Sequence, residues 1–202
     1  MEHTVTVVVL AGGQATRLPG KLARPIGAEN EPLVVRVVRQ LTVGGRPCVI
    51  SVREPLPSDL AARIAAPVAV DRYQDAGPLG GLASATAQVQ TPLTFAAAGD
   101  LANIDTTAID ELIERYESER ARGESVDAVV PRHSSGQLEP LAALYDTKVL
   151  HDNAVRALAS GNKKVTGALH GMHIAYYDIA PDRVVLYHNV NTAADLSGVI
   201  AR

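Results

Sequence analysis

The feature that most constrains this chain is an apolar strand that runs directly into a glycine turn. Residues 4–10 are apolar or β-branched, and Gly12 and Gly13 follow after a single alanine. Glycines let the backbone approach a ligand closely, and the N–H groups of such a turn bind phosphate oxygens. Arg17 and Lys21 add two cations to the same loop, which suits a polyphosphate. The segment predicts a phosphate-binding loop, and an ordinary turn with an exposed basic cluster is the alternative.

Two common phosphate-binding loops do not match this segment. A P-loop would place a glycine at position 15 and a serine or threonine at position 22, where the chain has Ala15 and Leu22. The dinucleotide fingerprint would place its third glycine at position 16, which is Thr16. The loop is therefore of another glycine-rich type.

Short apolar runs alternate with segments of helical periodicity, which indicates βαβ units and a mainly parallel sheet. The chain is predicted to be α/β, with a three-layer, doubly wound, Rossmann-like sheet, and its 202 residues suit a single domain over 1–202. Asp105 is placed to cap a helix, and the Ser-, Gly- and His-containing segment 132–139 predicts a mobile loop. The predicted strands are 4–10, 48–52, 68–70, 93–98 and 126–130, and the predicted helices are 33–41, 60–66, 79–89 and 106–122.

Charge, cysteine content and hydropathy exclude several classes of protein. The net charge is -3 and no basic block occurs, so the electrostatic footprint of a nucleic-acid binder is missing. Cys48 is the only cysteine, which excludes an internal disulfide and favours a reducing, cytoplasmic compartment. No apolar run approaches the ~20 residues of a membrane span, and the run at 5–11 is too short for a signal peptide.

Two acidic residues follow predicted strands, at the sheet edge where α/β proteins bind ligands. Asp71 follows 68–70 and Asp100 follows 93–98. A carboxylate just past an apolar strand is costly unless it is solvated or paired, and Mg²⁺ coordination would offset that cost at Asp100. A helix cap or an ion pair is the alternative role for Asp100.

These segments together resemble a known family. The string 10–17, Leu-Ala-Gly-Gly-Gln-Ala-Thr-Arg, with Lys21 downstream, resembles the signature of sugar-nucleotide and cofactor nucleotidyltransferases. Four further segments narrow the resemblance to the molybdenum cofactor guanylyltransferases (the MobA family), in the family's order over nearly the whole chain. They are Asp71 with 77–81 (Gly-Pro-Leu-Gly-Gly), 98–100 (Ala-Gly-Asp), 139–145 (Glu-Pro-Leu-Ala-Ala-Leu-Tyr), and 189–192 (Asn-Val-Asn-Thr) with Asp195.

The resemblance implies an enzyme that joins the GMP part of GTP to the terminal phosphate of molybdopterin and releases pyrophosphate. Mg²⁺ is the implied cofactor, with Asp100 as its ligand, and transient contact with cofactor-delivering proteins is an implied interaction. Arg17, Lys21 and Asp100 are the implied catalytic residues. The implied binding residues are Leu10, Ala11, Gly12, Gly13, Lys21, Asp71, Gly77, Pro78, Leu79, Gly80 and Asp100 for GTP, with Lys163, Asn189 and Asn191 on the acceptor side.

Several of these roles have alternatives. Asp71 would accept hydrogen bonds from guanine N1–H and N2–H2 or from a ribose hydroxyl, or would be an exposed strand-end acid. The glycines of 77–81 would admit a flat base, or would form a plain turn. Asn191 would be a second metal ligand, an acceptor contact or a turn residue, and Lys163 would neutralise the acceptor phosphate or be solvated.

The chain also departs from the family pattern. It has Ser51-Val-Arg53 where the family often has an asparagine, Gly20 before Lys21, Asp100-Leu-Ala-Asn103 in place of Asp-x-Pro-Phe, and Thr192-Ala193 without the usual proline. Two other functions therefore stay open. One is a related nucleotidyltransferase with another base or acceptor: a CTP-using molybdopterin enzyme, or a sugar-phosphate or phospholactate guanylyltransferase. The other is a non-catalytic module that binds a nucleotide or a partner.

Overall fold

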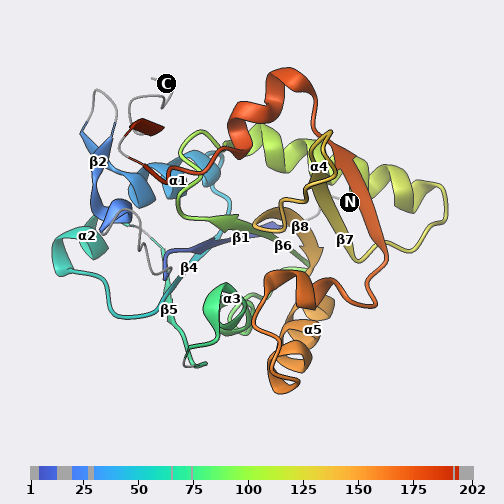
Figure 1. Ribbon diagram of the computed structural model, residues 1–202, viewed down its shortest axis with the longest axis horizontal. Helices are drawn as coiled ribbons and strands as arrows, with labels where there is room; N and C mark the ends of the chain where they lie inside the picture. Colours follow the sequence, from blue (N-terminus) through green and yellow to red (C-terminus); the bar gives the residue numbers. More distant parts are fainter. Residues whose placement is uncertain are drawn as a thin grey trace.

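A seven-stranded sheet forms the middle of the protein in the computed structural model, which describes residues 5–12, 20–26, 30–64, 66–73, 75–192 and 194–195 (Figure 1). The strand order is β5-β4-β1-β6-β8-β7-β9. The strands are β1 (Val5–Leu10), β4 (Cys48–Val52), β5 (Val68–Val70), β6 (Leu93–Ala98), β7 (Ala128–Arg132), β8 (Ala142–Asp146) and β9 (Ile174–Asp178), and β2 (Pro25–Ile26) pairs with β3 (Glu31–Pro32) apart from them.

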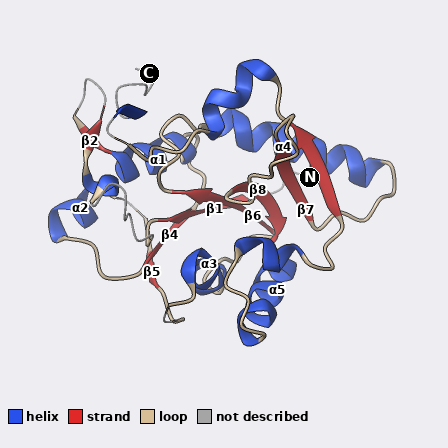
Figure 2. Cartoon of the chain, in the orientation of Figure 1, coloured by secondary structure: helices blue, strands red, loops and turns tan. Residues whose placement is uncertain are grey.

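Helices cover both faces of the sheet, which gives three layers (Figure 2). One core contains buried residues of α1 (Leu33–Leu41), α2 (Ser58–Arg63), α4 (Thr106–Ala121) and the 3-10 helix η3 (Pro181–Tyr187). The other contains buried residues of α3 (Gly77–Thr86), α5 (Thr147–Ala159) and η2 (Val165–Leu169). A further 3-10 turn, η1 (Lys21–Ala23), follows the glycine loop.

The central strands β1, β4 and β6 are mostly apolar and buried along nearly their whole length, because both of their faces are covered. In β1, Val7, Val8 and Val9 have no exposed surface. β1 pairs in parallel with β4 and with β6, and the register sets Leu10 opposite both Ser51 and Ala98. The three strands therefore end at the same edge of the sheet.

The predicted fold class is confirmed: the sheet is mainly parallel and doubly wound. β8 departs from the parallel pattern, because it runs antiparallel to both β6 and β7. β8, α5 and β9 were not predicted from the sequence. Some predicted boundaries are wrong: the helix predicted at 79–89 spans Gly77–Thr86, that at 60–66 spans Ser58–Arg63, that at 106–122 spans Thr106–Ala121, and the strand predicted at 126–130 spans Ala128–Arg132.

The segment predicted as a loop at 132–139 forms a tight turn after β7. The His133 N–H donates to the Gln137 carbonyl at 2.8 Å, and Arg132 forms an isolated bridge with Leu138. Among the described residues, no helix is long and apolar enough to cross a membrane.

The predicted cap at Asp105 is confirmed. Its side chain accepts a hydrogen bond from the Thr107 N–H at 3.1 Å at the start of α4. Asp146 caps α5 in the same way, by accepting from the Val149 N–H at 2.9 Å. Each carboxylate satisfies a backbone donor that the helix itself leaves unpaired.

Asp105→Ala is expected to lower the free energy of unfolding by about 1 kcal/mol, because α4 loses its cap. Asp105→Asn is the matched control, since asparagine caps helices about as well as aspartate. Urea unfolding followed by circular dichroism measures both variants. An alanine variant as stable as the parent protein would show that this cap does not stabilise the fold.

Candidate functional site

A row of backbone hydrogen bonds joins the ends of five neighbouring strands. In each bond, a residue at or just past the end of one strand donates its N–H to a carbonyl of the neighbouring strand. For the antiparallel β8, the acceptor lies just before the strand begins. The bonds are Asp71 N–H to Val52 O at 2.8 Å, Ala11 N–H to Ser51 O at 2.7 Å, Gly99 N–H to Leu10 O at 3.0 Å, and Ala98 N–H to Leu141 O at 2.9 Å. They hold the residues that follow β5, β4, β1 and β6 side by side.

Two glycines at these strand ends leave no room for a side chain. A Cβ atom at Gly12 would lie 2.8 Å from the Arg53 backbone nitrogen, and one at Gly99 would lie 2.9 Å from the Leu10 carbonyl oxygen. Both contacts are with backbone, which cannot rotate away. The glycine after β1 is therefore required by the approach of β4 as well as by any ligand.

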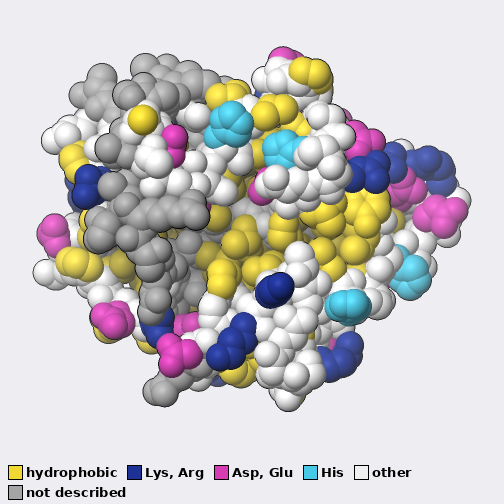
Figure 3. All heavy atoms as spheres, viewed as in Figure 1, with side chains coloured by type: hydrophobic (Ala, Val, Ile, Leu, Met, Phe, Trp, Pro, Cys, Tyr) yellow, Lys and Arg dark blue, Asp and Glu magenta, His cyan; other side chains and the backbone are white. Residues whose placement is uncertain are grey.

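A cavity of about 520 Å³ opens above these strand ends, and we call it the first cavity. Figure 3 shows apolar side chains exposed in the middle of one face of the molecule, beside the residues that are not described. The wall combines small and apolar residues with three carboxylates and one guanidinium. The lining residues are Leu10, Gly12, Leu22, Ser51, Arg53, Asp71, Asp75, Ala76, Gly77, Pro78, Gly81, Ala98, Gly99, Asp100 and Leu141.

Asp71 lines this cavity with a fixed carboxylate. Its Oδ1 accepts from the Tyr73 N–H at 2.8 Å and from the Ser84 hydroxyl at 3.2 Å. Its Oδ2 faces Gly80 of α3, where a Cβ atom would come within 3.1 Å. The small residues of 77–81 thus bring the helix close to the carboxylate, and Gly77 has the left-handed φ of 61° that glycine adopts readily.

Arg53 and Asp75 also line the first cavity, and sequence reasoning did not assign either to the site. The Arg53 Nη2 forms an ion pair with Asp75 Oδ1 across the cavity wall. From the sequence alone, Arg53 is recognisable only as a departure from the family pattern. The position of Arg53 directly after β4, the strand that neighbours β5 and Asp71, could have identified it as a site residue.

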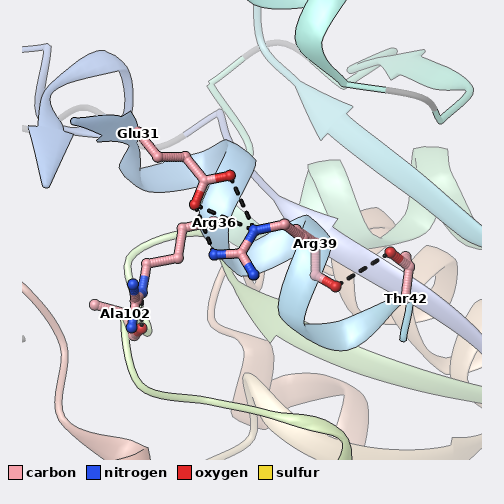
Figure 4. Close-up of polar contacts among 5 residues, drawn as sticks. All are labelled: Glu31, Arg36, Arg39, Thr42 and Ala102. Carbon is pink, nitrogen blue, oxygen red and sulfur yellow. Dashed lines mark hydrogen bonds and ion pairs between the residues drawn. The ribbon is translucent and has the colours of Figure 1, made fainter. Parts of the chain in front are cut away.

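The loop that carries Asp100 is held from two sides. From α1, the buried Arg36 donates from Nε to the Ala102 carbonyl at 3.1 Å (Figure 4). Arg39 of the same helix forms a bidentate ion pair with Glu31. From the C-terminal part of the chain, the Val190 N–H donates to the Asp100 carbonyl at 2.9 Å. The backbone of Asp100 is therefore fixed in place.

A second cavity, of about 550 Å³, is lined by Val190, whose N–H donates to the carbonyl of Asp100 in the wall of the first cavity. The His133 Nε2 and the Glu139 Oε1 are 2.9 Å apart in its wall, and Gln137 donates to the same carboxylate oxygen at 3.0 Å. The lining residues are Asn103, His133, Gln137, Glu139, Val184, Val185, Tyr187, His188, Asn189, Val190, Asn191, Ala194 and Asp195.

Asp195 orders the turn at 189–192. Its Oδ2 accepts from the N–H groups of Asn191 and Thr192, both at 2.7 Å, and the Thr192 hydroxyl accepts from the Asp195 N–H at 3.3 Å. These backbone donors lower the pKa of Asp195, because they favour its charged form. The arrangement is a reciprocal capping pair, and it directs this segment along the second cavity.

The structure therefore divides the predicted site residues into groups. The first cavity brings together Leu10, Gly12, Asp71, Gly77, Pro78 and Asp100, and the second contains Asn189 and Asn191. Ala11 lies in the strand-end row, whereas Leu79 and Gly80 are buried in α3. Lys163 is exposed, and its carbonyl oxygen would lie 3.5 Å from a Cβ atom added at Gly77. Gly13 and Arg17 lie outside the described residues, and Lys21 is described only in its backbone, in η1.

The number of carboxylates that lie together at the site determines how it would bind a metal ion. Among the residues that the structure describes, no group of three or more His, Cys, Asp or Glu side chains could hold a metal ion. Mg²⁺ does not need such a group, because it commonly takes one or two carboxylates, water and substrate phosphates. Asp100 in the wall of the first cavity fits that mode of binding.

Comparison with known proteins gives a consistent result. The model of the MobA-like NTP transferase domain matches residues 7–173. A protein of Natronomonas pharaonis named probable molybdenum cofactor guanylyltransferase is 29% identical, over 95% of this chain and 94% of its own length. A molybdenum cofactor guanylyltransferase of Burkholderia vietnamiensis is 28% identical, over 98% of this chain and 97% of its own length.

Among solved structures, the fold is similar to that of a protein of Archaeoglobus fulgidus called molybdopterin-guanine dinucleotide biosynthesis protein A. The TM-score is 0.76 at 23% identity, and the match covers 96% of each chain. At that identity the likeness establishes the fold alone.

Gly99→Ala is expected to lower the free energy of unfolding by roughly 1–3 kcal/mol, because the new methyl group overlaps the Leu10 carbonyl and forces β1 and β6 apart. Gly99→Ser should destabilise the protein at least as much. Chemical unfolding measures both. Unchanged stability in the alanine variant would mean that the strand ends are not packed as closely as the structure describes.

Proposed function

The chain belongs to the MobA-like NTP transferase family, a family of nucleotidyltransferases, and we propose that it transfers the GMP part of GTP to the terminal phosphate of molybdopterin. The observation that carries the proposal is the first cavity, where Gly12, Asp71, Gly77 and Asp100 meet. The names of relatives that match over nearly their full length support this reaction.

The nucleotide would lie along the strand ends in the first cavity. The base would occupy the end formed by Asp71 and the start of α3, where small residues leave room for a flat ring. The triphosphate would extend toward Gly12, where the glycine loop begins. Arg17 and Lys21 of that loop would neutralise the β and γ phosphates, as charge-assisted contacts to phosphate do.

Asp100 would hold Mg²⁺ together with phosphate oxygens and water. The ion would supply positive charge that neutralises the phosphates during transfer. The protein's own part is to fix the carboxylate, through the bonds from Arg36 to the Ala102 carbonyl and from the Val190 N–H to Asp100. A charged group that is already in position before the reaction does not have to reorganise while the transition state forms.

The acceptor would bind in the second cavity, where Val190 is hydrogen-bonded to Asp100 of the first. Asn189 and Asn191 offer amide groups there, and the His133–Glu139 pair offers a polar wall. An oxygen of the acceptor's phosphate would attack the α-phosphorus of GTP and form a new P–O bond. The bond from the α-phosphorus to the oxygen of the β-phosphate would break, and pyrophosphate would leave with that electron pair.

Asp100→Asn is expected to abolish Mg²⁺-dependent release of pyrophosphate in the presence of GTP and molybdopterin while leaving the thermal midpoint nearly unchanged. The amide keeps the shape of the side chain but lacks the charge that a hard cation requires. Turnover as a function of Mg²⁺ concentration, measured beside thermal unfolding, tests this expectation.

Asp152→Asn is the matched control, because this exposed aspartate of α5 pairs only at the surface, with Lys148. It should behave as the parent protein does. A well-folded Asp100→Asn protein with full transfer activity would contradict the role of Asp100. A parent protein that prefers CTP, or that releases pyrophosphate only with another acceptor, would contradict the choice of substrates.

A further inference from the structure

Arg53 and Asp71 occupy equivalent positions at the ends of neighbouring strands. Val52 of β4 is in register with Val70 of β5, and the Asp71 N–H donates to the Val52 carbonyl at 2.8 Å. Arg53 and Asp71 are the next residues of the two parallel strands. A donor-only side chain and an acceptor-only side chain therefore leave the same edge of the sheet and line the same cavity.

Asp75 holds the Arg53 guanidinium on this side of the cavity. It lies in the turn before α3, where its own φ of 52° and the φ of 61° at Gly77 bend the chain back toward β4. The ion pair uses one nitrogen of Arg53, Nη2, and one oxygen of Asp75. A guanidinium carries five N–H donors in a rigid plane, so further donors stay available to a ligand.

The pair of side chains matches one nucleobase. Guanine presents N1–H and N2–H2 as donors, and it presents O6, adjacent to N1, and N7 as acceptors. A carboxylate beside a guanidinium complements that edge, with Asp71 accepting from N1–H and N2–H2 and Arg53 donating to O6. Adenine carries an amino group at position 6 and a bare N1, so both contacts would be lost.

We propose that Arg53 is a specificity-determining residue that reads O6 of guanine, and that Asp75 is a positioning residue that holds the Arg53 guanidinium toward the base. The inference rests on the proposed function, because it assigns the base end of the nucleotide to the Asp71 end of the first cavity.

Binding of GTP, ITP and ATP without acceptor tests the proposal by calorimetry. ITP keeps O6 and N1–H but lacks the 2-amino group. Arg53→Ala should weaken the binding of GTP and of ITP by the same factor, roughly 10-fold to 100-fold. The weaker binding of ATP should stay nearly unchanged. Asp75→Asn, which keeps a residue that tolerates the left-handed turn, should produce a smaller loss with the same dependence on the base.

Equal losses for all three nucleotides would overturn the proposal, because they would assign Arg53 to the phosphates or the ribose. Unchanged binding of GTP by a well-folded Arg53→Ala protein would overturn it as well. Arg72→Ala is the matched control, a neighbouring arginine that does not line the cavity. A parent protein that binds GTP with this base dependence but transfers no GMP would support base reading and contradict the proposed function.

Discussion

The backbone hydrogen bonds that tie together the ends of β5, β4, β1, β6 and β8 are the constraint on which the rest of the structure depends. They bring main chains so close that Gly12 and Gly99 have no space for a methyl group. Asp71, Arg53 and Gly99, which directly follow β5, β4 and β6, then line one cavity. The cavity is therefore a consequence of the parallel register, and the candidate site residues Asp71 and Asp100 lie just past the strand ends.

Asp100 lines the first cavity and is hydrogen-bonded to Val190 in the wall of the second, so its surroundings come from distant parts of the chain. The buried Arg36 of α1 holds the loop from one side, and Val190 holds it from the other. Asp195 in turn orders the segment beside Val190. A nucleotide in the first cavity and an acceptor in the second would thus approach each other at a carboxylate whose backbone is already fixed.

Much of this arrangement could be predicted from the sequence. Leu10 ends a short apolar run, Gly12, Asp71 and Asp100 follow such runs, and parallel strands gather residues at these positions at one edge. Arg53 also directly follows a predicted strand, 48–52, but its alignment with Asp71 depends on the long-range register of β4 with β5. The antiparallel insertion of β8 and the burial of Arg36 against Ala102 likewise depend on contacts between segments far apart in the chain.

A crystal structure with GTP and Mg²⁺, determined without acceptor, would show directly whether the first cavity binds the nucleotide. Guanine is expected to lie between Asp71 and Arg53 against the start of α3. The α-phosphate is expected near Gly12, with a metal ion bound by a phosphate oxygen and the Asp100 carboxylate. A nucleotide bound in the second cavity, or a metal held away from Asp100, would contradict this expectation.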